Sequence, residues 1–312
     1  MNELKGLGTA LITPFKQDGS VDFEALKRLL DTQLTGHVDY IVVLGTTGEA
    51  ATLTADEKYE VRRFIVNYVR QKQKDDSLKQ KDDSLKLKAN SQKPIALVLG
   101  VGGNNTAQVI SELNAMRTEL ILDFTAILSV CPYYNKPNQE GLFRHFCAVA
   151  EASPIPVILY NVPGRTGVNL LPETVIRIYE AHPDKILGIK EASGNLEQIK
   201  RLIHLSHRQF AVISGDDGIA CEVMKAGGAG LISVASNAFA EDFWHIVHEQ
   251  DEALQAKYAE MIRLLFVEGN PSGIKTVLAQ KGLIENVLRL PLVSNSQAIQ
   301  DAISHQLSAL SR

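Results

Sequence analysis

Short apolar runs alternate with longer amphipathic segments along most of this chain. The runs are rich in Val, Ile and Leu and lack the polar alternation of a half-exposed strand, which is typical of strands covered on both faces in a parallel sheet. We predict eight strands, at residues 7–13, 39–45, 94–101, 123–130, 156–161, 185–190, 210–214 and 229–233.

The segments between these runs predict one helix after each strand. Asp22 precedes the run FEALKRLL, and Thr54 with Glu57 gives the outline of a capping box, both of which are helix-start signals. The predicted helices span residues 22–35, 54–70, 105–118, 139–152, 172–181, 195–207, 217–226 and 240–249. Eight strand–helix units with short loops predict an α/β fold, a TIM (β/α)8 barrel rather than an open doubly wound sheet.

Two segments fall outside the eight units. Residues 250–312 are mostly helix-forming, so we predict a C-terminal helical subdomain that follows a barrel at 1–249. A charged insertion at about 71–93 contains KQKDDSL at residues 72–78 and again at 79–85. Because it lacks an apolar stripe, we expect a solvated helix extension or loop on the face opposite the active site, with a docking element as the alternative.

Composition and charge exclude several classes of protein. Hydrophobic residues make up 45% of the 312 residues and charged residues 22%, as in globular chains. A formal net charge of -4 gives no basic field for nucleic acid or anionic lipid. The three cysteines lack metal-ligand spacing, and no apolar run is long enough to span a bilayer. We therefore expect a cytoplasmic protein with small-molecule partners, no nucleic acid and no membrane.

Lys190 is the most informative polar residue in an apolar run. It ends the sixth predicted strand, in GIKEASGN, where burial in the barrel mouth disfavours the ammonium and frees an amine that can attack a carbonyl. Glu191 is expected on the opposite face, as a salt-bridge partner of the helices. Taken alone, a strand-end lysine is more often simply ion-paired. The residues at the other strand ends therefore decide whether Lys190 is a structural or a reactive lysine.

Polar loops follow four other predicted strands. Residues 45–49 read GTTGE, whose glycines and hydroxyls suit a carboxylate. Residues 131–137 read CPYYNKP, and residues 160–167 read YNVPGRTG. Tyrosines there can relay protons, and Arg165 can grip a carboxylate with two parallel hydrogen bonds. Each loop also has a plainer explanation, namely a glycine turn, a packing tyrosine or, for SGDD at 214–217, a helix cap.

These motifs together resemble the dihydrodipicolinate synthase family, within the superfamily of pyruvate-dependent class I aldolases and lyases. GTTGE, PYYNKP, LYNVPGRTG, GIKEASGN and SGDD occur in register between about Gly6 and the last helices. The resemblance implies a Schiff base between Lys190 and pyruvate, with no metal and no dissociable cofactor. It also implies a proton relay of Tyr160, Thr46 and Tyr134.

The same resemblance implies the assembly and the substrate contacts. Tyr134 would reach into the site of a neighbouring subunit, which makes a homotetramer, a dimer of dimers, the expected form. The implied substrate-binding residues are Thr47 for the pyruvate carboxylate, Arg165 for the carboxylate of the second substrate, and Gly215 and Ile232 along the site.

The implied reaction joins pyruvate to L-aspartate 4-semialdehyde in the diaminopimelate and lysine pathway, giving 4-hydroxy-tetrahydrodipicolinate. The alternative is another aldolase that uses the same lysine, such as N-acetylneuraminate lyase or a 2-keto-3-deoxy sugar acid aldolase, but these relatives typically lack Arg165. A barrel that only binds its ligand is a third possibility. The only support for a phosphosugar isomerase is AGGAG at 226–230, which resembles a phosphate-binding loop. It precedes strand eight, which puts it on the face of the barrel away from the site.

The resemblance also bears on regulation by L-lysine. Lysine-inhibited members of the family build a site at the dimer interface from the helix after GTTGE, the loop after strand three and the first tyrosine of PYY. Inhibitable enzymes commonly hold histidine at the position of Lys58 and glutamate at that of Gln108. Because a cation repels a ligand ammonium, we expect little or no inhibition. The implied site residues are Ala51, Lys58, Asn104, Gln108 and Tyr133, with Ala50 and Ala55 beside them.

Overall fold

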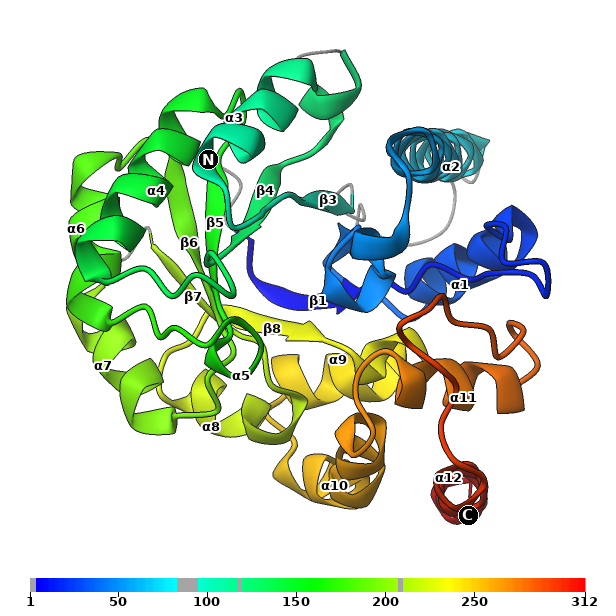
Figure 1. Ribbon diagram of the computed structural model, residues 1–312. Helices are drawn as coiled ribbons and strands as arrows, with labels where there is room; N and C mark the ends of the chain where they lie inside the picture. The colour runs from blue at the N-terminus through cyan, green and yellow to red at the C-terminus, as the bar shows by residue number, and fades with distance from the viewer. Residues whose placement is uncertain (1–3, 83–94, 117–118, 207–209, 312) are drawn as a thin grey trace.

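Eight parallel strands form a closed barrel surrounded by helices (Figure 1). The computed structural model describes residues 4–82, 95–116, 119–206 and 210–311. Each strand pairs with its neighbours in chain order, and the last pairs with the first, which confirms the predicted TIM barrel. The strands are β1 (Gly6–Ala10), β2 (Tyr40–Val43), β3 (Ala96–Gly100), β4 (Ala126–Val130), β5 (Val157–Asn161), β6 (Ile186–Glu191), β7 (Ala211–Ser214) and β8 (Gly230–Ser233).

Each predicted helix overlaps an observed one, and both predicted helix starts are confirmed. Asp22 accepts a hydrogen bond from the backbone N of Ala25 at 3.0 Å. Thr54 and Glu57 bond each other's backbone N–H groups at 3.2 and 2.9 Å, which is a capping box. The helices are α1 (Phe23–Thr35), α2 (Ala55–Asp82), α3 (Thr106–Ala115), α4 (Gln139–Ala152), α5 (Pro163–Thr166), α6 (Pro172–Ala181), α7 (Leu196–Leu205), α8 (Ala220–Lys225), α9 (Ala240–His248), α10 (Glu252–Phe266), α11 (Ser272–Gln280) and α12 (Gln297–Leu310).

Two hydrophobic layers share the strands between them. Alternate strand residues fill the barrel interior, among them Tyr40, Val98 and Ile158. The residues between them pack outward against the helices, as Ile41 and Ile127 do. The period of two along each strand therefore decides which side chains can reach the mouth of the barrel.

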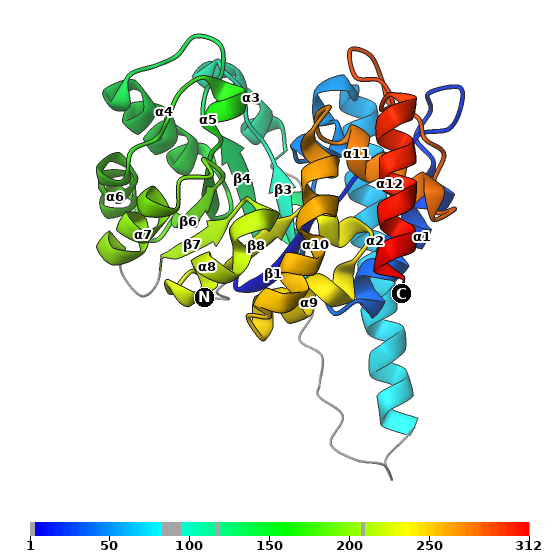
Figure 2. The ribbon, with the colours of Figure 1, turned by 90° about the horizontal axis from the view of Figure 1, so that it is seen from below.

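Helix α2 extends past its predicted end at residue 70, which confirms the helix-extension interpretation of the insertion as far as Asp82. It continues to Asp82, through the first KQKDDSL copy and into the second, because no proline or glycine stops it. Figure 2 shows its end extending past the barrel on the side away from α5, which follows the carboxyl end of β5. The predicted insertion beyond Asp82 lies outside the described residues.

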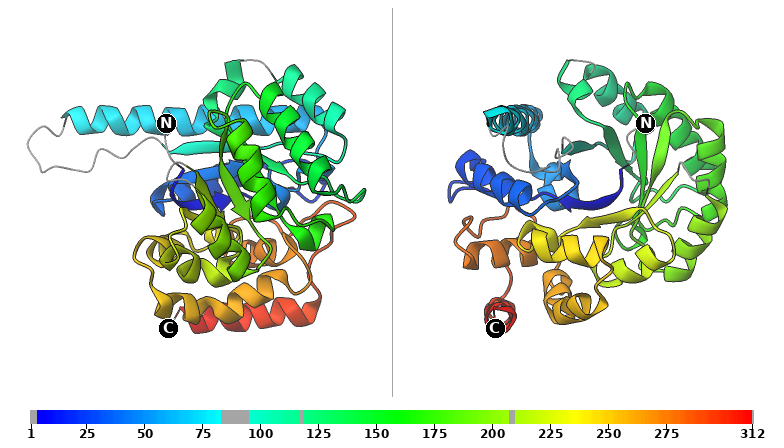
Figure 3. Two further views of the ribbon diagram at one scale, coloured as in Figure 1. Left: turned by 90° about the vertical axis from the view of Figure 1, so that its left-hand side faces the viewer. Right: turned by 180° about the vertical axis from the view of Figure 1, so that it is seen from behind.

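The last three helices pack together on one flank of the barrel. Figure 3 shows α12 alongside α10, and α10 also contacts α9 and α11. The loop between α11 and α12 folds back over α1, where Arg28 donates two hydrogen bonds to the carbonyl of Leu283. The C-terminal region also reaches the loop that follows β2, where Asn270 bonds Thr47 and the backbone N of Arg289 donates to Glu49. In the part of the chain that the structure describes, no helix has the length and apolar character needed to span a membrane.

Candidate active site

Lys190 and Tyr160 lie side by side at the barrel mouth. The two residues are register partners on β6 and β5, and the Lys190 ammonium lies 4.5 Å from the centre of the Tyr160 ring. The lysine is only 6% exposed. Among the described residues no carboxylate forms an ion pair with it, so a structural salt bridge does not account for this buried lysine. Its amine is held beside a phenol that can exchange protons.

Glu191 points away from the mouth, as strand alternation predicts. Its carboxylate is fully buried and accepts hydrogen bonds from Asn161 Nδ2 at 2.9 Å, Gln198 Nε2 at 3.0 Å and the backbone N of Ser193 at 2.8 Å. The expected salt bridge is therefore wrong, because amides take the place of a cation. These bonds fasten β6 to β5 and to α7, and so hold the strand that carries Lys190.

The two threonines of GTTGE differ in their surroundings. Thr47 is buried, and its hydroxyl accepts a hydrogen bond from Asn270 Nδ2 at 3.0 Å. Thr46 is exposed. The turn is fixed from below, since Thr13 donates its hydroxyl hydrogen to the carbonyl of Gly48 at 2.7 Å. Within this loop the Thr47 hydroxyl is therefore buried in the protein, while Thr46 is accessible to solvent.

Asn270 also links Arg165 to this loop, although the sequence pattern did not single it out. Arg165 is exposed on α5, and its Nη2 donates to the carbonyl of Asn270 at 3.3 Å. Asn270 thus contacts both a predicted carboxylate-binding threonine and a predicted carboxylate-binding arginine. The only signal for it was the Gly-Asn-Pro break before α11, which indicates a helix end rather than a site.

Gly215 and Ile232 take the positions expected of lining residues. A Cβ atom built on Gly215 would lie 2.8 Å from Lys190 Cε, so only glycine leaves the lysine its space. Ile232 belongs to the interior layer of the barrel. Gly215 therefore bounds the space around Lys190 from the β7 side, and the position of Ile232 on β8 agrees with an interior role.

Tyr134 is not brought to Lys190 within one chain. It is 88% exposed and has a φ of 74°, which is unusual for a bulky residue. Its neighbour Tyr133 is also exposed. Asn135 anchors this loop to β3's side of the barrel by donating to the carbonyl of Asn104 at 2.8 Å.

The proposed regulatory residues partly share a cavity of about 460 Å³ between α2 and α3. Lys58 and Gln108 line it, together with Arg62 and Glu112, which sequence reasoning did not assign. Burial lowers the pKa of Arg62, while the nearby Glu112 opposes that shift. The cavity therefore holds two cations and one carboxylate.

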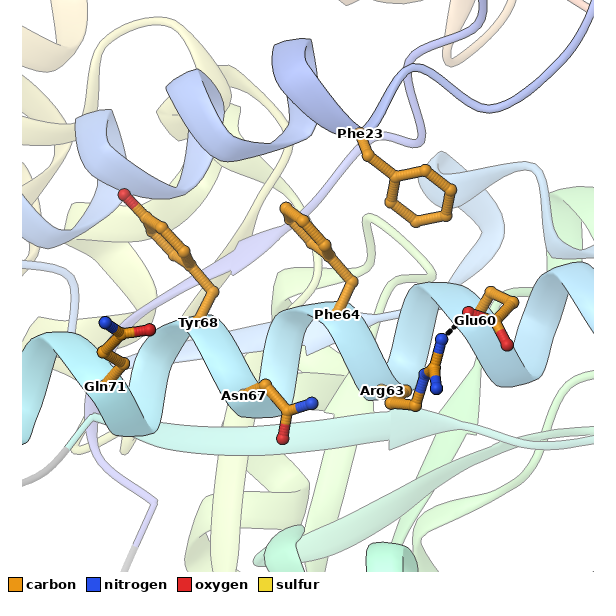
Figure 4. A pocket seen from close by; sticks show the side chains of 7 residues that line it. All are labelled: Phe23, Glu60, Arg63, Phe64, Asn67, Tyr68 and Gln71. Atoms are coloured by element: carbon orange, nitrogen blue, oxygen red, sulfur yellow. Dashed lines mark hydrogen bonds and ion pairs between the residues drawn. The ribbon is translucent and has the colours of Figure 1, made fainter.

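A second cavity, of about 320 Å³, lies between α1 and α2 (Figure 4). Phe64 and Tyr68 project from α2 toward α1, and their rings stack at 6.1 Å. This groove is on the outer helical layer and holds none of the predicted site residues. Over the described residues, no group of three or more His, Cys, Asp and Glu side chains could bind a metal ion.

The two acidic residues after β7 have different roles. Asp216 caps the short helix that follows, accepting from the backbone N of Gly218 at 2.9 Å, which agrees with the capping interpretation of SGDD. Asp217 is buried, and its Oδ2 accepts from the backbone N atoms of Val234 and Ala235 at 3.1 and 3.4 Å. Burial raises the pKa of Asp217 to about 6.

Comparison with known proteins gives consistent results along the whole chain. The family model described as the dihydrodipicolinate synthetase family matches residues 3–74 and 79–310. The 4-hydroxy-tetrahydrodipicolinate synthase of Flavobacterium psychrophilum is 46% identical over 318 residues, covering 99% of this chain and 100% of that protein.

Solved structures agree with the sequence relatives. A chloride-inhibited dihydrodipicolinate synthase from Acinetobacter baumannii, complexed with pyruvate, aligns with a TM-score of 0.87 at 35% identity, over 99% of both chains. A monomeric dihydrodipicolinate synthase variant aligns with a TM-score of 0.84 at 34% identity, over 97% of this chain and 96% of that one.

The buried Asp217 predicts a pH-dependent stability. Its folded pKa of about 6 lies above the ordinary value of 3.8, so its contribution is fully present below pH 3.8 and is lost as pH rises through 6. Between pH 4.5 and 7.5 the wild type should lose about 2 kcal/mol of unfolding free energy relative to Asp217→Asn. Urea unfolding at both pH values measures this. Asp216→Asn is the matched control, and an equal pH response in both variants would contradict the assignment.

Proposed function

The chain belongs to the dihydrodipicolinate synthetase family, and from this premise we propose that Lys190 forms the Schiff base through which it condenses pyruvate with L-aspartate 4-semialdehyde. Its activity is that of a Schiff-base-forming lyase. The observation that carries the assignment of Lys190 is its burial beside Tyr160 without an ion-pair partner among the described residues.

The reaction proceeds through an iminium and an enamine. The Lys190 amine adds to the pyruvate ketone and water leaves, which gives an iminium that draws electrons from the methyl group. Loss of one methyl proton forms the enamine, whose carbon attacks the aldehyde to make the new C–C bond. The amine of the semialdehyde then adds to the former ketone carbon, closes the ring and releases Lys190. The product is 4-hydroxy-tetrahydrodipicolinate.

The neighbouring residues divide proton transfer from substrate binding. Tyr160, which lies beside Lys190, is the proton shuttle, and Thr46 with Tyr134 extends the relay. Thr47 holds the pyruvate carboxylate. Arg165 holds the carboxylate of the semialdehyde, which favours this acceptor over a sugar acid. Gly215 and Ile232 shape the space around the pyruvate carbon.

The exposure of Tyr134 supports an oligomeric active form. A tyrosine that is 88% exposed in a single chain completes the relay only if it enters the site of a second copy. The smallest active unit in this proposal is a dimer, and a homotetramer is a dimer of such dimers. The three free thiols of Cys131, Cys147 and Cys221 support a reducing compartment, the cytoplasm.

Borohydride added with pyruvate should trap Lys190 as a stable secondary amine. Mass spectrometry should find the adduct on Lys190, while Lys190→Ala should give neither adduct nor turnover and should keep the wild-type circular dichroism spectrum. Lys275 is the internal control, because it is also buried but is ion-paired. An adduct on Lys275 or any other lysine would overturn the assignment.

Replacing Arg165 by alanine should weaken the semialdehyde step and spare Schiff-base formation. A charge-assisted bidentate pair contributes roughly 1.5 to 3 kcal/mol, so kcat/KM for the semialdehyde should fall by roughly 10- to 150-fold. Stopped-flow measurement of pyruvate binding should remain unchanged. Arg144→Ala, which removes an exposed arginine paired with Glu140, is the control. An unchanged kcat/KM in Arg165→Ala would count against the role.

We also propose that L-lysine inhibits this enzyme weakly or not at all. Lys58 and Arg62 outnumber the carboxylate of Glu112 in the cavity between α2 and α3, and Gln108 is neutral there. Half-inhibition should need more than millimolar lysine in a coupled assay. The paired change Lys58→His with Gln108→Glu should increase sensitivity roughly thirtyfold, since each charge change contributes about 1 kcal/mol. Submillimolar half-inhibition of the wild type would contradict this.

A further inference from the structure

Lys275 on α11 is a second buried lysine, and it contacts the loop that follows β2. Its ammonium forms an ion pair with Glu49, and both side chains are completely inaccessible to solvent. It also donates a hydrogen bond to the carbonyl of Val287 at 3.0 Å and lies 4.1 Å from the centre of the Phe15 ring. The charge is therefore enclosed on all sides by protein.

Stability alone gives a weak reason for such a pair. Removing two charges from water is costly, and replacing a buried ion pair by apolar residues of similar volume is often neutral or stabilising. The cost is visible here, because burial lowers the pKa of Lys275 to about 8 even though Glu49 opposes the shift. Fixing one conformation is the better-supported use of a buried pair.

Glu49 lies in the turn whose conformation decides how Thr46 and Thr47 are presented. It directly follows Thr46, Thr47 and Gly48, and its φ of 50° is left-handed, a conformation that is strained for a residue with a side chain. Its backbone N donates to the carbonyl of Thr46 at 3.1 Å. Its Oε2 accepts from the backbone N of Arg289 at 3.1 Å. The carboxylate therefore anchors the turn that presents both threonines.

The C-terminal region holds this turn at two points. Asn270, two residues before α11, donates to the hydroxyl of Thr47, and Lys275, one turn into α11, pairs with Glu49. Two contacts from one short segment fix both the position and the tilt of the loop. A neutral Thr47 hydroxyl and backbone N–H groups can bind a carboxylate only if they are held in a defined direction.

We propose that Lys275 is a positioning residue, whose ion pair with Glu49 sets the conformation of the Thr46–Thr47 loop and thereby the affinity for pyruvate. This rests on the proposed function of the loop. Loss of the pair should act on the first substrate, since Lys190 and Tyr160 are carried by other strands.

The experiment compares single and paired substitutions. Lys275→Met keeps the length of the side chain but leaves Glu49 buried and unpaired, so it should lower stability and raise the KM for pyruvate. Lys275→Met combined with Glu49→Gln removes both charges. It should recover the stability of the wild type while the KM for pyruvate stays at least fivefold raised. Lys281→Met is the matched control with wild-type kinetics, because Lys281 lies at the opposite, C-terminal end of α11, with its ammonium over the Phe239 ring.

Borohydride trapping at graded pyruvate concentrations separates this inference from the proposed function. The half-saturating pyruvate concentration should rise in the paired variant by the same factor as KM, with the adduct still on Lys190. A wild type that forms no adduct would refute the proposed function itself. A folded paired variant with wild-type half-saturation, an equal rise in Lys281→Met, or a paired variant that fails to fold would each overturn the positioning role alone.

Discussion

The register between β5 and β6 is the constraint on which the site depends. It places Lys190 and Tyr160 next to each other on the interior side of the barrel. A slip of one residue would exchange Lys190 for Glu191 and turn a carboxylate into the mouth. The buried amide bonds to Glu191 oppose that slip from the outside of the strand. The hydrogen bonds of Glu191 on the outer side of β6 thus keep Lys190 on the inner side.

The C-terminal region packs directly against the loop after β2 and supports its conformation. Asn270 and Lys275 lie far along the chain from Thr47 and Glu49, yet each contacts its partner directly. Arg289 joins the same region to the start of α2 by pairing with Glu57. The loop after β2 is therefore enclosed by groups from both ends of the chain, and its geometry is a property of the complete fold.

Local pattern was enough to predict most of the fold. Strand and helix positions follow from apolar periodicity, and the capping box at Thr54 follows from residues three apart. The barrel-mouth position of Lys190 also follows, because it needs only the strand's period. Asn270 and Lys275 could not be found this way, because their partners lie more than 200 residues away. Local sequence patterns do not indicate contacts over such a separation. The roles of Thr46, Tyr134 and Arg165 came from resemblance, and a single chain leaves Tyr134 exposed.

The length of the repeated segment suits α2, which contains the first copy and the start of the second. Seven residues make almost two turns of an α-helix, so one copy adds about 10.5 Å of length and rotates the next by only about 20°. Residues 72–75 and 79–82, the matching parts of the two copies that lie in α2, therefore begin in nearly the same direction around the axis. A unit of this size therefore lengthens a helix by almost two turns with little rotation about its axis. An insertion whose length is not close to a whole number of turns would rotate the helix by a larger angle about its axis.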